Sequence, residues 1–120
     1  MSNRPTHFEI PVDDVERAQA FWSNAFGWRF QRFGEWDYWM VMTGEGPGID
    51  GGMMPRNPGQ PIVNSINVPN IDEAISAVEA NGGTIVVPKR AIPGVGWLSY
   101  FTDPDGNIHG IMQEDPSATM

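Results

Sequence analysis

The chain has 120 residues, with 15 acidic and 7 basic side chains, a formal net charge of −8 and no cysteine. This length suits one compact domain with its own core, and the lack of cysteine excludes disulfide frameworks, thiolate nucleophiles and iron–sulfur clusters. The acidic balance disfavours nucleic acid as a partner, because phosphate binding requires a basic surface. The same charge either keeps the protein in solution or favours a neutral or cationic small ligand.

No segment approaches the roughly 18 apolar residues that a membrane helix needs. The first 20 residues also lack the basic and then apolar layout of a signal peptide. We therefore expect a cytoplasmic protein without a membrane partner.

The first half of the chain predicts a strand, a helix and three more strands. The first strand covers about residues 7–12, and Asp13 or Asp14 then caps a helix that runs to Phe26 before Gly27 ends it. The apolar face of this helix is expected to place Phe21, Trp22 and Phe26 in the core. The later strands are expected over residues 28–33, 38–43 and 50–54.

The second half repeats this order. A strand over residues 62–68 precedes a helix that is capped by Asn70, with Glu73 in a capping-box position, and that ends before Gly82. The strands that follow are expected over residues 84–87, 96–102 and 107–113. Residues 7–32 align with residues 63–88, and residues 48–54 align with residues 106–112. We therefore predict one domain, residues 1–120, made of two βαβββ modules, about 6–54 and 62–114, joined by a proline-rich linker over 55–61.

Three further segments carry turn or loop signals. Residues 89–96 contain two glycines and a proline and are predicted to form a flexible loop beside the ligand site. Residues 103–106, DPDG, predict a tight turn in which Gly106 takes the position that needs positive φ. The residues after Glu114 show no pattern and are expected to fray.

The duplicated module resembles the vicinal oxygen chelate superfamily, which includes glyoxalase I, bleomycin resistance proteins, methylmalonyl-CoA epimerase and extradiol dioxygenases. The segments that carry the resemblance are HFEIPVDDVERAQAFW, EANGGTIVVP and YFTDPDGNIHGIMQ, and together the similarity covers about residues 6–114. It implies an α+β fold in which two cupped mixed sheets share a groove and the helices lie outside. Homodimers are common in this superfamily, so a homodimer is expected here.

Strand alternation then divides the side chains between the helix side and the groove. In the first strand, Phe8, Ile10 and Val12 should face the helix, which leaves His7 and Glu9 for the groove. In the matching strand of the second module, Ile66 and Val68 take the helix side, and Val63, Ser65 and Asn67 take the groove.

The resemblance also implies four positions for metal ligands on the first and last strands of each module. These positions hold His7, Gly52, Val63 and Gly110. One imidazole cannot supply the several donors that such a site requires, so we expect the usual metal site to be absent and no cofactor to be bound. A rebuilt divalent-metal site at His7 with Glu9 or Asp50 is the alternative, whereas His109 should point away from the groove.

Gly52 and Gly110 can be interpreted in two ways. They either enlarge a pocket or allow close packing of the modules. Aromatic residues between positions 28 and 39 are more numerous than one core face needs, so some of them are expected to contact a ligand. Methionines add adaptable apolar surface. The predicted ligand contacts are His7, Glu9, Trp39, Asp50, Gly52, Met54, Ser65, Asn67, Trp97, Gly110 and Met112.

Three functional hypotheses follow. The leading one is a protein that binds an apolar or aromatic small molecule in its groove without a metal. The second is a metal-dependent lyase, isomerase or dioxygenase that uses the rebuilt site. The third is a partner or regulatory module whose groove is closed by a second chain. The sequence identifies no catalytic residue.

Overall fold

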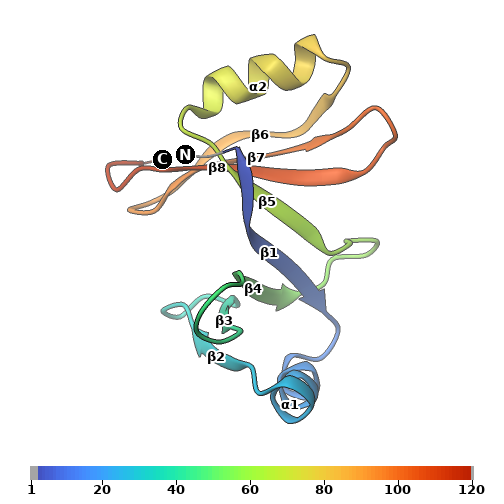
Figure 1. Ribbon diagram of the computed structural model, residues 1–120, viewed down its shortest axis with the longest axis vertical. Helices are drawn as coiled ribbons and strands as arrows, with labels where there is room; N and C mark the ends of the chain where they lie inside the picture. Colours follow the sequence, from blue (N-terminus) through green and yellow to red (C-terminus); the bar gives the residue numbers. More distant parts are fainter. Residues whose placement is uncertain (1–2, 120) are drawn as a thin grey trace. The chain divides into compact units, whose positions relative to one another are not determined.

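The computed structural model describes residues 3–119 and contains two helices and eight strands (Figure 1). Its contacts divide the chain into two compact units. The first unit covers residues 7–63, and the second covers residues 64–119 together with residues 3–6. The strand and helix order is βαβββ followed by βαβββ, which confirms the predicted α+β fold class.

In the first unit, the strands lie in the order β2–β3–β4–β1. Strand β1 is parallel to β4, whereas β3 is antiparallel to both β2 and β4. The element bounds are β1 Arg4–Val12, α1 Val15–Phe26, β2 Arg29–Arg32, β3 Trp39–Met42 and β4 Asp50–Pro55.

The second unit repeats this sheet in the order β6–β7–β8–β5, with β5 parallel to β8 and the other pairs antiparallel. The element bounds are β5 Val63–Asn67, α2 Ile71–Ala80, β6 Thr84–Ile92, β7 Gly96–Thr102 and β8 Ile108–Glu114. Neither helix is long and apolar enough to span a membrane among the residues described.

The predicted helix caps are present. The Asp14 carboxylate accepts a hydrogen bond from Arg17 N at 3.0 Å, and the Asn70 side chain accepts one from Glu73 N at 3.0 Å. Each bond satisfies an amide that the first helical turn leaves unpaired. Gly27 ends α1 in the left-handed region, with φ 75°, where glycine meets no side-chain penalty.

The core of each unit lies between its helix and one face of its sheet. In the first unit this core contains Ile10, Val12, Val41 and Met53, with Phe8 packed against them. In the second unit it contains Val68, Ile71 and Ile111, with Ile66 packed against them. The predicted assignment of residues 8, 10, 12, 66 and 68 to the helix side is therefore confirmed.

The prediction that three aromatic residues of α1 are core residues is wrong for two of them. Phe21 and Phe26 are 55% and 64% exposed, whereas Trp22 packs against the core. Trp22 also stacks on Trp28, with ring centroids 4.5 Å apart. The two phenyl rings contact Trp22 instead of the core, with ring centroids 5.0 Å from it for Phe21 and 5.5 Å for Phe26.

Residues 89–92 are part of β6 and do not form the predicted flexible loop. Arg90 pairs with Leu98 and Ile92 pairs with Gly96 across the antiparallel ladder. The prediction stopped the strand near Pro88, but β6 is an edge strand, where a proline removes no ladder hydrogen bond. The connection itself is short, and Gly94 takes φ 75° in it.

The end of the chain is ordered through Thr119, contrary to the expected fraying. Asp115 N donates to Val95 O at 2.9 Å, and Gly94 N donates to Ala118 O at 3.1 Å. Ala118 is 1% exposed. The tail is fixed by backbone bonds to the β6–β7 turn, which hydrophobic periodicity does not reveal; Met120 lies outside the described residues.

Candidate functional site

The strand register of the first unit determines which residues share the face opposite α1. Glu9 on β1 pairs with Gly52 on β4, which pairs with Met40 on β3. Because side chains alternate along each strand, His7 and Met54 lie on this same face. We refer to it as the open face of the first unit.

Tyr38 is the residue on this face that sequence reasoning missed. Its hydroxyl lies 3.0 Å from Nε2 of His7. A Cβ built at Gly52 would collide with this hydroxyl. Tyr38 lies just before β3, two positions before Met40. Its side-chain direction could have been predicted only from the alternation along the strand, once Met40 was known to pair with Gly52.

Burial keeps this tyrosine and histidine uncharged at neutral pH. Desolvation lowers the pKa of His7, against the smaller opposing effects of Glu9 and Asp50. Desolvation, aided by the negative charge of Glu9, raises the pKa of Tyr38 to about 12. The two groups therefore form a neutral hydrogen-bonded pair whose donor depends on the imidazole tautomer.

The second unit places its other tyrosine over a glycine in a related way. Gly110 pairs with Tyr100 on β7 and with Ser65 on β5. A Cβ at Gly110 would lie 3.3 Å from the Tyr100 ring and 3.3 Å from Ser65 Oγ. The Tyr38 ring fills the space above Gly52, and the Tyr100 ring lies close to Gly110, so the first of the two readings, an enlarged pocket, is not supported at Gly52.

The remaining polar contacts predicted from the sequence have local partners. Asp50 is exposed, and its Oδ1 accepts hydrogen bonds from Thr43 N at 2.9 Å and Thr43 Oγ1 at 3.0 Å. Asn67 Nδ2 donates to Glu114 Oε2 at 3.2 Å. Met112 pairs with Asn67 in the β5–β8 register and is half-buried.

Two predicted contacts, Trp39 and Trp97, lie on the helix side of their sheets. Trp39 pairs with Met53 and packs against the first core, and Trp97 packs against the second core. A cation stands over each indole, with the Arg32 guanidinium carbon 5.2 Å and Lys89 Nζ 4.6 Å from the ring centroids. Strand alternation carries both rings away from the face on which Gly52 and Gly110 lie, so the sequence-based placement of the tryptophans was wrong.

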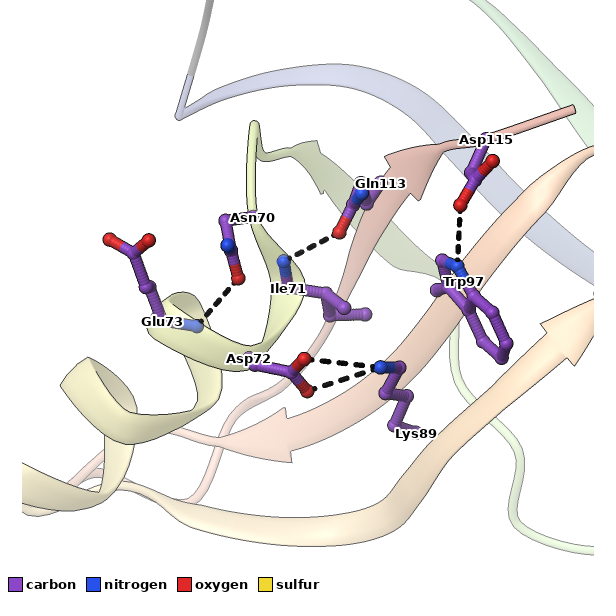
Figure 2. Close-up of polar contacts among 8 residues, drawn as sticks. All are labelled: Asn70, Ile71, Asp72, Glu73, Lys89, Trp97, Gln113 and Asp115. Carbon is purple, nitrogen blue, oxygen red and sulfur yellow. Dashed lines mark hydrogen bonds and ion pairs between the residues drawn. The ribbon is translucent and has the colours of Figure 1, made fainter. Parts of the chain in front are cut away.

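Figure 2 shows how Trp97 is fixed beside α2. Its indole N–H donates to Asp115 Oδ2 at 3.0 Å, and Lys89 Nζ lies 3.2 Å from both carboxylate oxygens of Asp72. Hydrogen bonds from Ser117 and then from Trp97 lower the pKa of Asp115. This cluster joins α2, β6, β7 and the end of the chain.

The donors around His7 do not form a metal-binding group in the described part of the chain. Across residues 3–119, no three histidine, aspartate or glutamate side chains come together as a possible metal-binding group. The rebuilt site of His7, Glu9 and Asp50 is therefore not assembled, and His7 Nε2 is already bonded to Tyr38. His109 lies on the helix side, as predicted, with Nε2 2.9 Å from Asp103 Oδ2 and its ring 5.3 Å from that of Phe101.

Comparisons with known proteins agree with this architecture. Residues 4–44 match a family model described as bleomycin resistance protein-like N-terminal. A glyoxylase-like domain-containing protein of Didymella fabae is 35% identical over 112 residues, covering 86% of this chain and 88% of that protein.

Solved structures share the fold at low sequence identity. Methylmalonyl-CoA epimerase from Mycobacterium tuberculosis superposes with a TM-score of 0.72 at 13% identity, covering 96% of this chain and 90% of that one. A glyoxalase/bleomycin resistance protein/dioxygenase superfamily member from Vibrio splendidus gives a TM-score of 0.67 at 15% identity, covering 96% and 100%. At these identities the likeness concerns the fold.

Proposed function

Because the chain belongs to the glyoxalase/bleomycin resistance protein/dioxygenase superfamily, we propose that it binds an apolar or aromatic small molecule without the metal ion that many members use. The observation that carries this proposal is the neutral Tyr38–His7 pair above Gly52. On the open face the imidazole of His7 is bonded to the Tyr38 hydroxyl, and the charged group nearby is the Glu9 carboxylate.

The open face suits a ligand that has one polar oxygen on an apolar body. Met40 is 36% exposed, and Met54 is half-buried, so flexible thioether side chains flank the polar pair. A ligand carbonyl can accept from the Tyr38 hydroxyl when the His7 tautomer leaves that proton available. The nearby charge of Glu9, which acts on both groups, disfavours an anionic ligand.

The other predicted contacts divide between the two units. Glu9, Gly52 and Met54 share the open face with His7. In the second unit, Ser65, Asn67, Gly110 and Met112 lie on the strands β5 and β8. We propose Glu9 and Met54 as ligand contacts on the open face and Ser65, Asn67 and Met112 as contacts within the second unit. We leave out Gly52 and Gly110, which the tyrosine rings cover, and Trp39 and Trp97, which pack against the cores.

The test uses protein treated with a chelator and a panel of neutral, cationic and anionic aromatic ligands, with binding measured by calorimetry. A binder from the neutral or cationic group is expected. Tyr38→Phe should weaken its binding by about fivefold, since one net hydrogen bond is lost. Tyr100→Phe changes the other tyrosine in the same manner and shows whether the second unit takes part in binding. Binding that appears only after divalent metal is restored would overturn the proposal.

The second candidate is a metal-dependent lyase, isomerase or dioxygenase. It is favoured by one observation, the imidazole of His7 at a family metal position on β1. Elemental analysis of protein prepared without chelators separates the two candidates. Stoichiometric metal that is lost in His7→Ala would replace the binding proposal with this one.

We also propose a homodimer. Large apolar side chains are exposed in the first unit, including Trp36 at 61% and Ile62 at 62%, and such surface favours association. Size-exclusion chromatography with light scattering measures the mass, and a monomer at high micromolar concentration would reject the dimer. The cytoplasmic location stays a prediction.

A further inference from the structure

The turn that joins β2 to β3 carries three aromatic rings that contact one another in sequence. The centroid of the Phe33 ring lies 6.3 Å from that of Tyr38 and 6.4 Å from that of Trp36. Both pairs are close to perpendicular, with interplanar angles of 78° and 75°. Phe33 and Trp36 are 37% and 61% exposed, so a group from outside the chain can reach both rings.

Hydrogen bonds hold this turn in place. Phe33 N donates to Tyr38 O at 2.8 Å, and Trp36 N donates to Phe33 O at 3.2 Å. Arg32 Nε donates to Trp36 O at 2.8 Å. Gly34 adopts φ 60° within the turn, where glycine meets no side-chain penalty. The rings are therefore held in a defined arrangement, which lowers the cost of ordering them around a ligand.

The spacing of the rings matches a cation that contacts two perpendicular ring faces. Elsewhere in this protein, Lys89 Nζ lies 4.6 Å from the Trp97 ring centroid, within the range over which a ring face attracts a cation. A cation at that distance above each of two perpendicular rings requires ring centroids about 6.5 Å apart, close to the separations in the turn. Phe21 and Trp22 on α1 are also perpendicular, but their centroids are 5.0 Å apart, which leaves less room between the faces.

The charge around the rings also favours a cation. From residue 33 to residue 55 the chain carries four acidic side chains and no basic one. One of the four, Glu35, precedes Trp36 directly in the turn. Arg32, which comes before this segment, forms an ion pair with Asp37 at 2.9 Å, so its positive charge is balanced within the turn. A positively charged ligand is therefore attracted to this surface.

We propose that Phe33 and Trp36, with the Tyr38 ring beside them, bind a small soluble molecule that carries a quaternary ammonium group. The methyl groups pack on the ring faces, and the positive charge is attracted by those faces and by Glu35. A quaternary ammonium has no N–H group that would lose hydrogen bonds to water on an aromatic surface, so it suits this site better than a primary ammonium. The site uses neither the Tyr38 hydroxyl nor His7, so the proposal does not depend on the function proposed for the open face.

The test compares choline with 3,3-dimethylbutan-1-ol, which has the same shape without the positive charge. Binding is followed on the full chain through the indole N–H resonance of Trp36 in proton–nitrogen correlation NMR, and the loss of this resonance in Trp36→Ala assigns it. Choline at millimolar concentration should shift the resonance in a saturable manner. The neutral alcohol should bind at least about fivefold more weakly, because it lacks the attraction of a cation to two ring faces.

Three variants make the test specific, with affinity measured on the choline methyl signal. Trp36→Ala removes one ring face and should weaken choline binding by about threefold or more. Phe26→Ala removes a ring of α1 that is 64% exposed, and it is the matched control that should leave the affinity unchanged. Glu35→Gln removes only the neighbouring charge, so choline should bind about twofold more weakly and the neutral alcohol as before.

A Trp36 resonance that choline leaves unmoved would overturn the proposal. Equal affinity for choline and the neutral alcohol in the unaltered protein would also overturn it, and this comparison does not depend on the folding of any variant. If the resonance moves on dilution of the protein and not with choline, a second copy of the chain covers Trp36 and the proposal is wrong. Cosedimentation with phosphatidylcholine vesicles without a response to free choline would assign the rings to a membrane surface and reject a small soluble ligand.

Discussion

The Tyr38 hydroxyl lies 3.0 Å from Nε2 of His7 and fills the space that a side chain at position 52 would require. Glycine at position 52 is therefore needed for the pair to form. A metal-ligating side chain at this position and the tyrosine–histidine pair exclude each other sterically.

Gly52→Ala should destabilise the first unit through this collision. The added Cβ must displace the Tyr38 ring, and overpacking of this kind costs about 1–3 kcal/mol. In a Tyr38→Ala background the same substitution should cost much less, because the ring is gone. Urea unfolding of the two single variants and the double variant measures the coupling. Additive effects would show that Tyr38 does not occupy this space.

The stability of the protein should fall at alkaline pH because of Tyr38. Its pKa is raised from 10.0 to about 12 in the folded state, so between these values the folded protein binds more protons than the unfolded chain. Stability is therefore fully present below pH 10 and is lost as the pH rises towards 12. Urea unfolding at a series of pH values measures this decline. Tyr38→Phe should flatten the curve relative to Tyr100→Phe, and an unchanged slope in Tyr38→Phe would contradict the assignment.

The element order and the helix ends were predictable because they depend on local signals. Asp14 and Asn70 cap helices through their own neighbours, and the repeat shows the same order twice. The direction of a side chain near an irregular segment is different. Tyr38 and Trp39 are adjacent, and the sequence placed Trp39 on the wrong face of the sheet. Only the pairing of β3 with β4 reveals that Trp39 lies beside buried Met53. Aromatic content alone does not distinguish the two faces of a sheet.

The order of the chain end was missed for a related reason. Asp115 and Ala118 are held by backbone hydrogen bonds to residues about 20 positions earlier. Backbone bonds of this kind leave no pattern of apolar residues, so composition suggested a frayed tail.

The Lys89–Trp97 contact should contribute more to stability than the Lys89–Asp72 ion pair. Lys89 Nζ lies 4.6 Å from the indole centroid, and a cation over an aromatic face contributes about 0.5–1 kcal/mol at such sites. The Asp72 side chain is 70% exposed, and exposed ion pairs contribute little. Lys89→Met, which retains the aliphatic stem, should lower the free energy of unfolding by that amount, whereas Asp72→Asn should have almost no effect. Equal losses in the two variants would indicate that the ion pair is the more important contact.

Removal of the residues after Glu114 should loosen the β6–β7 turn. The deletion takes away the acceptor of the Gly94 amide and the donor to Val95 O, the Asp115 carboxylate that accepts from the Trp97 indole, and the buried Ala118 side chain. Each of the three lost hydrogen bonds contributes about 0.5–1.5 kcal/mol in typical proteins, so a loss of roughly 1.5–4.5 kcal/mol in unfolding free energy is expected. Hydrogen exchange of the Gly94 amide gives a local readout, because its protection should disappear in the deleted chain.

Asp115→Asn, which keeps the backbone bonds and an acceptor for the indole, is the matched control and should retain that protection. Gly94 exchange that is equally slow with and without the tail would show that these bonds do not hold the turn.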